Sequence, residues 1–175
     1  MVAAVMSTEK LLLAERGKVF EYSFEDLLRY HGPGSPGGVA HAFKVLELAL
    51  PILSADAPCE RREISIQTSF RGPGARDAFE MATRAVTGER YALDDSLARP
   101  ELGRARERFV FRLSYRERSA TLVLRDGFVT EEFIELARKE DRSADEESKL
   151  DRMKLDLAER LMARPASEVY DVVEP

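Results

Sequence analysis

The residues best suited to chemistry gather at positions 29–43, RYHGPGSPGGVAHAF, which include both histidines of the chain, His31 and His41. Ser35 follows His31 closely, so the loop could pair a hydroxyl nucleophile with an imidazole base, and Asp77 could orient that imidazole. The same serine precedes a proline and a helix-forming stretch, where serine ordinarily accepts hydrogen bonds from the first N–H groups of a helix. We favour this capping role, because it already gives Ser35 a sufficient function.

A second loop, RGPGARDA at residues 71–78, repeats the pattern of a charged residue, Gly-Pro-Gly and a helix start. Such a loop exposes backbone N–H groups at the positive end of a helix dipole, which suits an anion. If the two loops lie side by side, they would hold a phosphate or carboxylate in a pocket of His31, Gly34, Ser35, Gly37, Arg71, Gly74 and Asp77. The alternative is tight turns alone, since neither loop has the spacing of a phosphate-binding or dinucleotide-binding motif.

The two histidines are also the candidate metal ligands, because imidazole is a common ligand of zinc. An acidic group or a thiol would have to complete the set around His31 and His41, and the candidates are Asp77, Glu80 and Cys59. The alternative for each histidine is a structural role, bonding backbone groups around the turn. The single cysteine excludes an internal disulfide and is too few for an iron–sulfur cluster. We therefore expect no cofactor, with zinc as the alternative.

The composition is typical of a globular protein. The chain has 175 residues, of which 44% are hydrophobic and 34% charged. Its net charge of -5 argues against a general nucleic-acid binder, whose surface would carry a basic patch. We expect a single domain over residues 1–175, with an N-terminal extension at 1–19 and a C-terminal helix and tail at 145–175.

No segment is expected to cross a membrane. The longest apolar stretch, residues 39–53, is interrupted by His41, Lys44, Glu47 and Pro51. The N-terminal MVAAVM has no positively charged leader, so we expect no secretory signal. Together with a lone cysteine, which suits a reducing compartment, these features predict a cytoplasmic protein.

Helices and strands are expected in the order of an α+β fold. Capping and helical spacing predict helices within residues 7–16 (capped by Ser7 or Thr8), 23–32, 35–50, 73–88, 130–142 and 143–164. Alternating apolar residues predict strands within 60–70, 108–115 and 119–126, the last two joined as an antiparallel hairpin. Residues 89–107 are expected to be irregular and 167–173 extended. The expected architecture is a small, mainly antiparallel sheet packed with helices.

The stretch FEDLLRYHGPGSPGG resembles the hallmark of the FmdE-like family of formylmethanofuran dehydrogenase subunits, a His-Gly-His-x-Cys-Pro-Gly loop that follows a short helix. Residues 31–32 and 36–37 match that pattern, whereas Pro33 stands at the second histidine and Ser35 at the cysteine. The second loop is similar to another family feature. It keeps the Asp-Ala pair at 77–78 and the Thr-Gly pair at 87–88, with Gly74 in place of a cysteine.

The likeness spans about residues 20–175, because the closing segment LAERLMARPASEVYDVVEP also resembles that of the family. The resemblance implies an FmdE-like fold and, in the family, a transition metal, commonly zinc, bound by those histidine and cysteine side chains. Pro33, Ser35 and Gly74 offer no such ligand, so that only His31 remains of the set.

The resemblance and the loops together predict a cytoplasmic, FmdE-like homodimer that is not itself a dehydrogenase. It would bind a small anionic ligand or serve as an assembly subunit, with a degenerate metal site. The alternative is a zinc-binding protein or enzyme with a site rebuilt around His31 and His41. Family members are often dimers, and the seam is expected at the hairpin of residues 108–125 or at the C-terminal helix.

Overall fold

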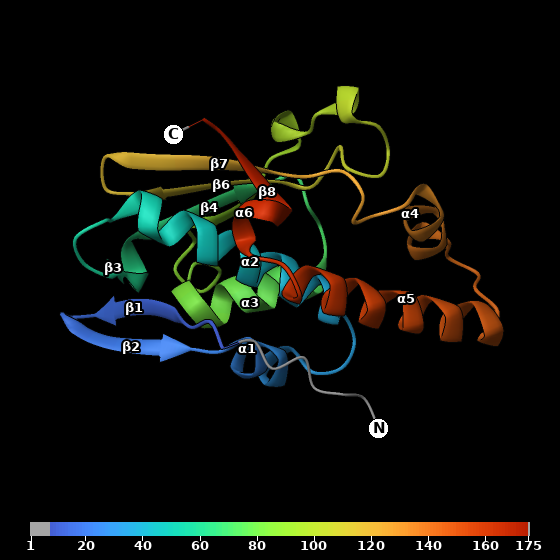
Figure 1. Cartoon of the computed structure of the whole chain (residues 1–175), viewed down its shortest axis with the longest axis horizontal. Helices are drawn as coiled ribbons and strands as arrows, with labels where there is room; N and C mark the ends of the chain where they lie inside the picture. Colours follow the sequence, from blue (N-terminus) through green and yellow to red (C-terminus); the bar gives the residue numbers. More distant parts are fainter. Residues whose placement is uncertain (1–7, 175) are drawn as a thin grey trace.

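The computed structural model describes residues 8–174, which form six α-helices and two sheets, with α2 lying between the sheets (Figure 1). The helices are α1 (Phe24–His31), α2 (Pro36–Leu53), α3 (Pro73–Thr83), α4 (Glu131–Arg138), α5 (Ala144–Met162) and α6 (Ala166–Val169). The strands are β1 (Leu11–Glu15), β2 (Lys18–Tyr22), β3 (Cys59–Glu60), β4 (Ile64–Thr68), β5 (Tyr91–Leu93), β6 (Val110–Tyr115), β7 (Arg118–Leu124) and β8 (Tyr170–Glu174). The predicted α+β class is confirmed.

The larger sheet has the strand order β5-β4-β6-β7-β8. Its β4–β6, β6–β7 and β7–β8 pairs are antiparallel, and its β4–β5 pair is parallel. The predicted hairpin is confirmed, since β6 and β7 pair from Val110 opposite Val123 to Tyr115 opposite Arg118. The smaller sheet has the order β2-β1-β3, with β1 antiparallel to β2 and parallel to β3.

Helix α2 forms the core that the two sheets share. It contacts α3, α5, the smaller sheet through β1 and the larger sheet through β6 and β7. Phe43 and Leu46, near its middle, have no exposed surface. By length and a hydropathy of 1.2 it is the one described helix that could cross a membrane, but 72% of it is buried inside the fold. That burial is typical of the core helix of a soluble protein.

The first predicted helix is wrong, because residues 11–22 form the β1–β2 hairpin. Leu11 and Leu13 alternate inward with the period of a strand and join the core. Arg16 and Gly17 form the turn, both with positive φ (51° and 75°), as a two-residue hairpin turn requires. Their N–H groups donate to the Glu60 carboxylate at 2.9 and 2.7 Å. Ser7, one of the two proposed caps, lies outside the described residues.

Helix α3 ends at Thr83 rather than at Gly88, so its predicted C-terminus is wrong. Arg84 adopts a left-handed conformation, with a φ of 56°, and turns the chain. The Glu80 carboxylate then accepts hydrogen bonds from the N–H groups of Val86 and Thr87, at 2.8 and 3.0 Å. The Glu80 side chain therefore accepts from two N–H groups that, in a longer helix, would have bonded to backbone carbonyl oxygens.

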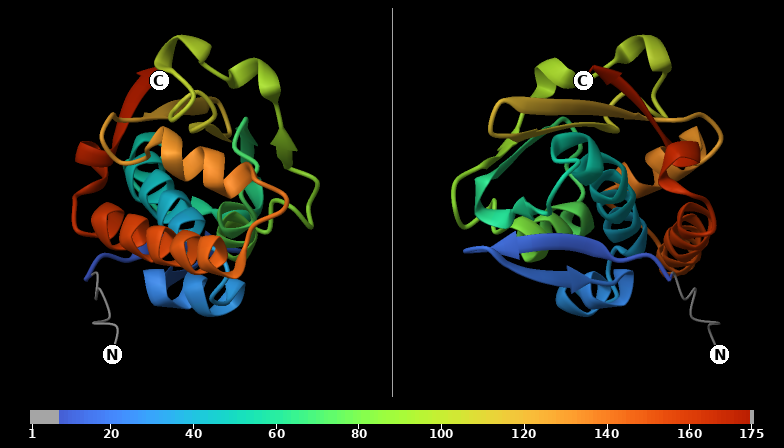
Figure 2. Two further views of the ribbon diagram at one scale, coloured as in Figure 1. Left: turned by 90° about the vertical axis from the view of Figure 1, so that its right-hand side faces the viewer. Right: turned by 60° about the vertical axis from the view of Figure 1, so that its left-hand side comes forward.

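Two segments are more regular than expected. Residues 89–107 contain β5 and two 3-10 turns, and the extended tail begins with the short helix α6 before β8. Helices α4 and α5 lie next to each other at one end of the molecule, in front of α2 in the left view of Figure 2. This end of the molecule also contains the starts of α2 and α3.

Candidate ligand-binding site

Helices α2 and α3 begin side by side, because glycine lets their backbones touch. A Cβ atom added at Gly74 would fall under 3.0 Å from the carbonyl oxygen of Ser35, a separation that real Cβ atoms essentially never show. One added at Gly38 would lie 3.0 Å from the amide nitrogen of Ala75. The structure thus brings the two Gly-Pro-Gly loops together, as an anion site between them requires.

The start of α2 carries uncapped backbone donors. Pro36 occupies its first position, and Ser35 makes no side-chain hydrogen bond to the helix, so the interpretation of Ser35 as a side-chain cap is wrong. The φ of -143° and ψ of 64° at Ser35 lie outside the extended geometry that aims a capping hydroxyl at the first turn. Gly37 and Gly38 follow, and no side chain among residues 8–174 caps their N–H groups.

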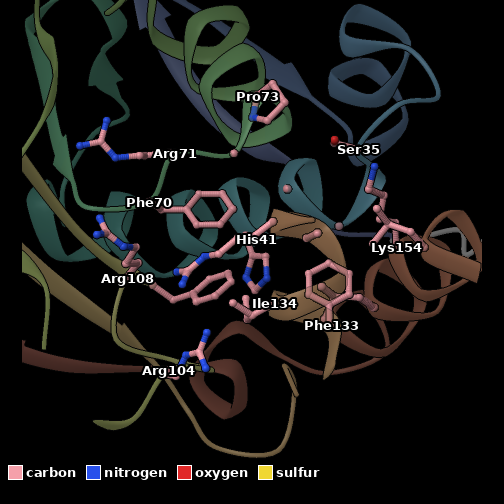
Figure 3. A pocket seen from close by; sticks show the side chains of 18 of the residues that line it. Ser35, His41, Phe70, Arg71, Pro73, Arg104, Arg108, Phe133, Ile134 and Lys154 are labelled. Carbon is pink, nitrogen blue, oxygen red and sulfur yellow. The ribbon is translucent and has the colours of Figure 1, made fainter. Parts of the chain in front are cut away.

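A cavity of about 570 Å³ opens at this junction, between the starts of α2 and α3, the chain before β6, and helices α4 and α5 (Figure 3). Its apolar wall consists of Phe70, Phe109, Phe133, Ile134, Ala137, Leu150 and Leu157. Its cationic side chains are Arg71, Arg104, Arg108, Arg138, Arg142 and Lys154. Ser35, Gly37, Gly38, His41, Gly72 and Pro73 complete the described lining, which includes no carboxylate. We call this site the basic cavity.

The arginines of the basic cavity are held by carboxylates that lie outside its lining. Arg71 and Arg108 share Asp95, at 2.8 and 2.9 Å, and their hydrogen bonds, that of Arg108 above all, hold the pKa of Asp95 below its usual value. The other pairs, with their N–O distances, are Arg104–Glu135 (3.5 Å), Arg138–Glu107 (3.9 Å) and Arg142–Glu147 (2.8 Å).

Lys154 differs from these arginines. Its Nζ donates to the carbonyl oxygen of Gly34 at 3.1 Å, and it has no carboxylate partner in the described part of the chain. Six cations and four carboxylates therefore leave two surplus positive charges around the basic cavity.

His41 lies at the floor of the basic cavity, where Figure 3 shows its ring among Phe70, Phe133 and Ile134. Its Nδ1 is 2.7 Å from the hydroxyl of Tyr170. Burial, aided by the charge of Arg160, lowers the pKa of His41 to about 3, so the imidazole is neutral at physiological pH. Burial also raises the pKa of Tyr170 well above its usual value.

His31 has a different partner. Its Nδ1 lies 2.8 Å from the Oδ2 atom of Asp77, which matches the proposed orientation of the imidazole by that carboxylate. No hydrogen bond joins His31 to Ser35 among residues 8–174, so the nucleophile–base pair is not assembled. Of the predicted pocket, Ser35, Gly37 and Arg71 line the basic cavity, whereas His31, Gly34, Gly74 and Asp77 do not.

The proposed metal ligands do not gather. Among residues 8–174, no group of three His, Cys, Asp or Glu side chains is placed to hold a metal ion. Glu80 is engaged with the turn after α3, and Cys59 is a buried residue of β3. Burial raises the pKa of the Cys59 thiol to about 11, which keeps it protonated and unreactive.

Most of the cationic lining was missed from the sequence, because its members come from separate segments. Arg108 and Arg104 lie before β6, Arg138 ends α4, and Lys154 is in α5. One local signal was available, the run of arginines at positions 104, 106 and 108. No sequence pattern distinguished the apolar wall, because its phenylalanines are equally typical of an ordinary hydrophobic core.

Comparison of the chain with protein-family models gives no match, and comparison with curated proteins gives none either. The fold and the cavity together define an α+β protein with a cationic, apolar-walled cavity.

Proposed function

We propose that this protein is a non-catalytic binding protein whose ligand is a small organic anion held in the basic cavity. The observation that carries the proposal is the charge of the described lining, in which six arginine and lysine side chains and no carboxylate surround an apolar space. The chain as a whole has a net charge of -5, so the cavity reverses the overall sign. A local positive potential in a concave, apolar-walled site attracts and retains an anion.

The size and wall of the basic cavity favour an organic ligand over a bare ion. Small-molecule sites typically enclose about 300–1,000 Å³ with mostly apolar walls and few polar groups, and the volume of about 570 Å³ suits this class. The start of α2, with the uncapped N–H groups of Gly37 and Gly38, adds the positive end of a helix dipole. The ligand would therefore combine a hydrocarbon body with a carboxylate or phosphate.

The resemblance to the FmdE-like family supports the same role. A family loop that has exchanged its cysteine and second histidine for Ser35 and Pro33 retains the glycines and the helix start, which serve an anion without a metal. We extend the proposal to a cytoplasmic, FmdE-like protein with a degenerate metal site.

Lys154→Met should weaken binding of 1-naphthyl phosphate about tenfold, as measured by isothermal titration calorimetry. Among the described residues Lys154 is the lining cation without a carboxylate partner, so its charge is available to the ligand. A hydrogen bond to a charged group contributes about 1.5–3 kcal/mol, and methionine keeps the unbranched four-atom stem of lysine without its ammonium group. Uncharged 1-naphthol should bind both proteins equally and weakly.

The matched control is Lys149→Met in the same helix. Lys149 is half-exposed, pairs with Glu132 and does not line the basic cavity, so its loss should leave the affinity unchanged. Equal weakening by the two variants, or no binding of 1-naphthyl phosphate by the wild type, would contradict the proposed function.

A role as an assembly subunit is the second candidate, and the edge of the larger sheet supports it. Strand β8 is terminal in the sheet order, and its Val172 and Val173 are 42% and 39% exposed. A free edge with exposed valines is a surface on which a second copy can add its strand. Strands β6 and β7 lie inside the sheet, so the hairpin offers no such edge.

We expect light scattering to show a homodimer, and we expect Val172→Lys to convert it to a monomer, because a charged side chain at this edge opposes strand pairing. A wild-type monomer would refute this candidate.

A further inference from the structure

The imidazole of His41 has a buried atom that no described residue pairs with. His41 is 1% exposed and lines the basic cavity, and its Nε2 has no hydrogen-bond partner within residues 8–174. Buried polar atoms are nearly always paired, so an unpaired one on a side chain that lines a cavity calls for an explanation.

The contact with Tyr170 decides which nitrogen of His41 carries the proton. Tyr170 is 1% exposed, and the described part of the chain offers its hydroxyl no partner besides Nδ1 of His41. If Nδ1 carried the proton, the hydroxyl hydrogen and Nε2 would both be unpaired. If the hydroxyl donates to Nδ1, only the Nε2 proton lacks a partner. The second arrangement leaves fewer buried polar groups unsatisfied, so Nε2–H is a donor.

The described surroundings of His41 provide no acceptor for this donor. The rings of Phe109 and Phe70 pack against the imidazole, with centroid separations of 4.8 and 6.0 Å. Phe133 and Ile134 face the same cavity from α4. These four side chains are hydrocarbon, so the donor stands in apolar surroundings and meets an acceptor only when a bound molecule supplies one. Burial also keeps the pKa of His41 near 3, so the donor is a neutral group.

We infer that the ligand of the basic cavity is an amphipathic organic anion whose buried end carries an oxygen acceptor for the Nε2–H group of His41. The inference rests on the proposed function, in which the ligand is an organic anion. It adds which chemical group the ligand carries at the end opposite to its anionic group. The lining arginines and Lys154 attract the charge, the phenylalanines contact the body, and His41 selects a carbonyl-type oxygen over a hydrocarbon group. A site that donates a buried hydrogen bond discriminates strongly against a ligand lacking the acceptor. Tyr170 is a positioning residue, because it acts through the imidazole.

Two probes of nearly equal shape test this inference, 4-acetylphenyl phosphate and 4-isopropylphenyl phosphate, each titrated calorimetrically into the full chain. The acetyl group carries the acceptor oxygen, and the isopropyl group replaces it with a methyl. The wild type should bind the acetyl compound about tenfold more tightly. His41→Leu should bind both compounds equally, whereas His31→Leu, which removes the histidine outside the lining, should keep the preference.

Tyr170→Phe provides a second variant that keeps the ring at position 170 and the imidazole. Without the hydroxyl, the proton of His41 is free to move to Nδ1, so the preference should shrink below the wild-type value. If His41→Leu does not fold, the affinities of Tyr170→Phe for the two probes test the inference in its place. An unchanged preference in it would overturn the assigned role of Tyr170 and the tautomer.

The outcomes separate the inference from the proposed function. Equal affinity of the wild type for the two probes overturns the inference, while the proposed function stands if Lys154→Met still weakens both. Binding of 1-naphthyl phosphate without binding of either probe also overturns the inference. If none of the three phosphates binds, the proposed function itself falls.

Discussion

The Gly74→Ala variant should lose about 3 kcal/mol of its free energy of unfolding, measured by urea denaturation. The added Cβ would fall under 3.0 Å from the carbonyl oxygen of Ser35 and would lie 3.0 Å from the amide nitrogen of Val39. Both are backbone atoms of the α2 start, so relief requires α2 and α3 to move apart. In most helices the same substitution is favourable by up to about 1 kcal/mol, which makes the expected sign diagnostic.

Gly34→Ala is the matched control, because it changes the other Gly-Pro-Gly loop by the same single methyl group. Its Cβ would meet only Nε2 of His31, at 3.9 Å, which is an ordinary contact. We expect a change in the free energy of unfolding within about 0.5 kcal/mol for this variant. Equal stabilities of the two variants would show that α2 and α3 are not in backbone contact.

The free energy of unfolding should fall by about 1.6 kcal/mol as the pH is lowered from 6.5 to 5, because of His41 alone. An unfolded histidine takes up a proton near pH 6.5, whereas burial holds the pKa of folded His41 near 3. The unfolded state therefore binds more protons between these two values, and stability is lost as the pH falls through this window. Well above pH 6.5 the contribution is complete and constant.

The pH window between 6.5 and 5 isolates this histidine from the carboxyl groups. Carboxylates such as Asp95, whose pKa the hydrogen bonds of Arg108 and Arg71 hold below the usual range, lose their contribution only at lower pH. His41→Gln should remove about 1 kcal/mol per pH unit from the mean slope in this window, whatever its effect on the absolute stability. The same slope in the variant as in the wild type would mean that His41 is protonated in the folded protein.

Elements controlled by neighbouring residues were predictable. The helix from Ser23 to Gly32 was found because its capping box joins Ser23 and Asp26, three residues apart. The hairpin of β6 and β7 followed from alternation on both sides of the short RER segment at residues 116–118, of which Arg118 already belongs to β7. The start of α4 followed from Thr130, whose hydroxyl accepts from the N–H of Phe133. In each case the atoms that define the boundary lie within a few residues of one another.

Elements controlled by distant residues were not predictable. Residues 11–15 read as a capped helix, yet β1 is a strand because it pairs with β3 and because Glu60 binds the turn at Arg16 and Gly17. The end of α3 involves nearer residues, because the Glu80 carboxylate accepts from the N–H groups of Val86 and Thr87 only once Arg84 has turned the chain. Local propensity does not contain either interaction, since each depends on the folded path of the chain.

The candidate site likewise combines features that were predictable from the sequence with features that were not. From the sequence alone came the α+β class, the two Gly-Pro-Gly helix starts and the prediction that they suit an anion, because glycine, proline and the helix dipole act locally. Only the tertiary structure placed Gly38 and Gly74 in backbone contact, set His41 beside Tyr170, and gathered Arg104, Arg108 and Lys154 around one cavity. These residues meet because burial of the α2 core drives distant segments together, and that packing has no signature in sequence spacing.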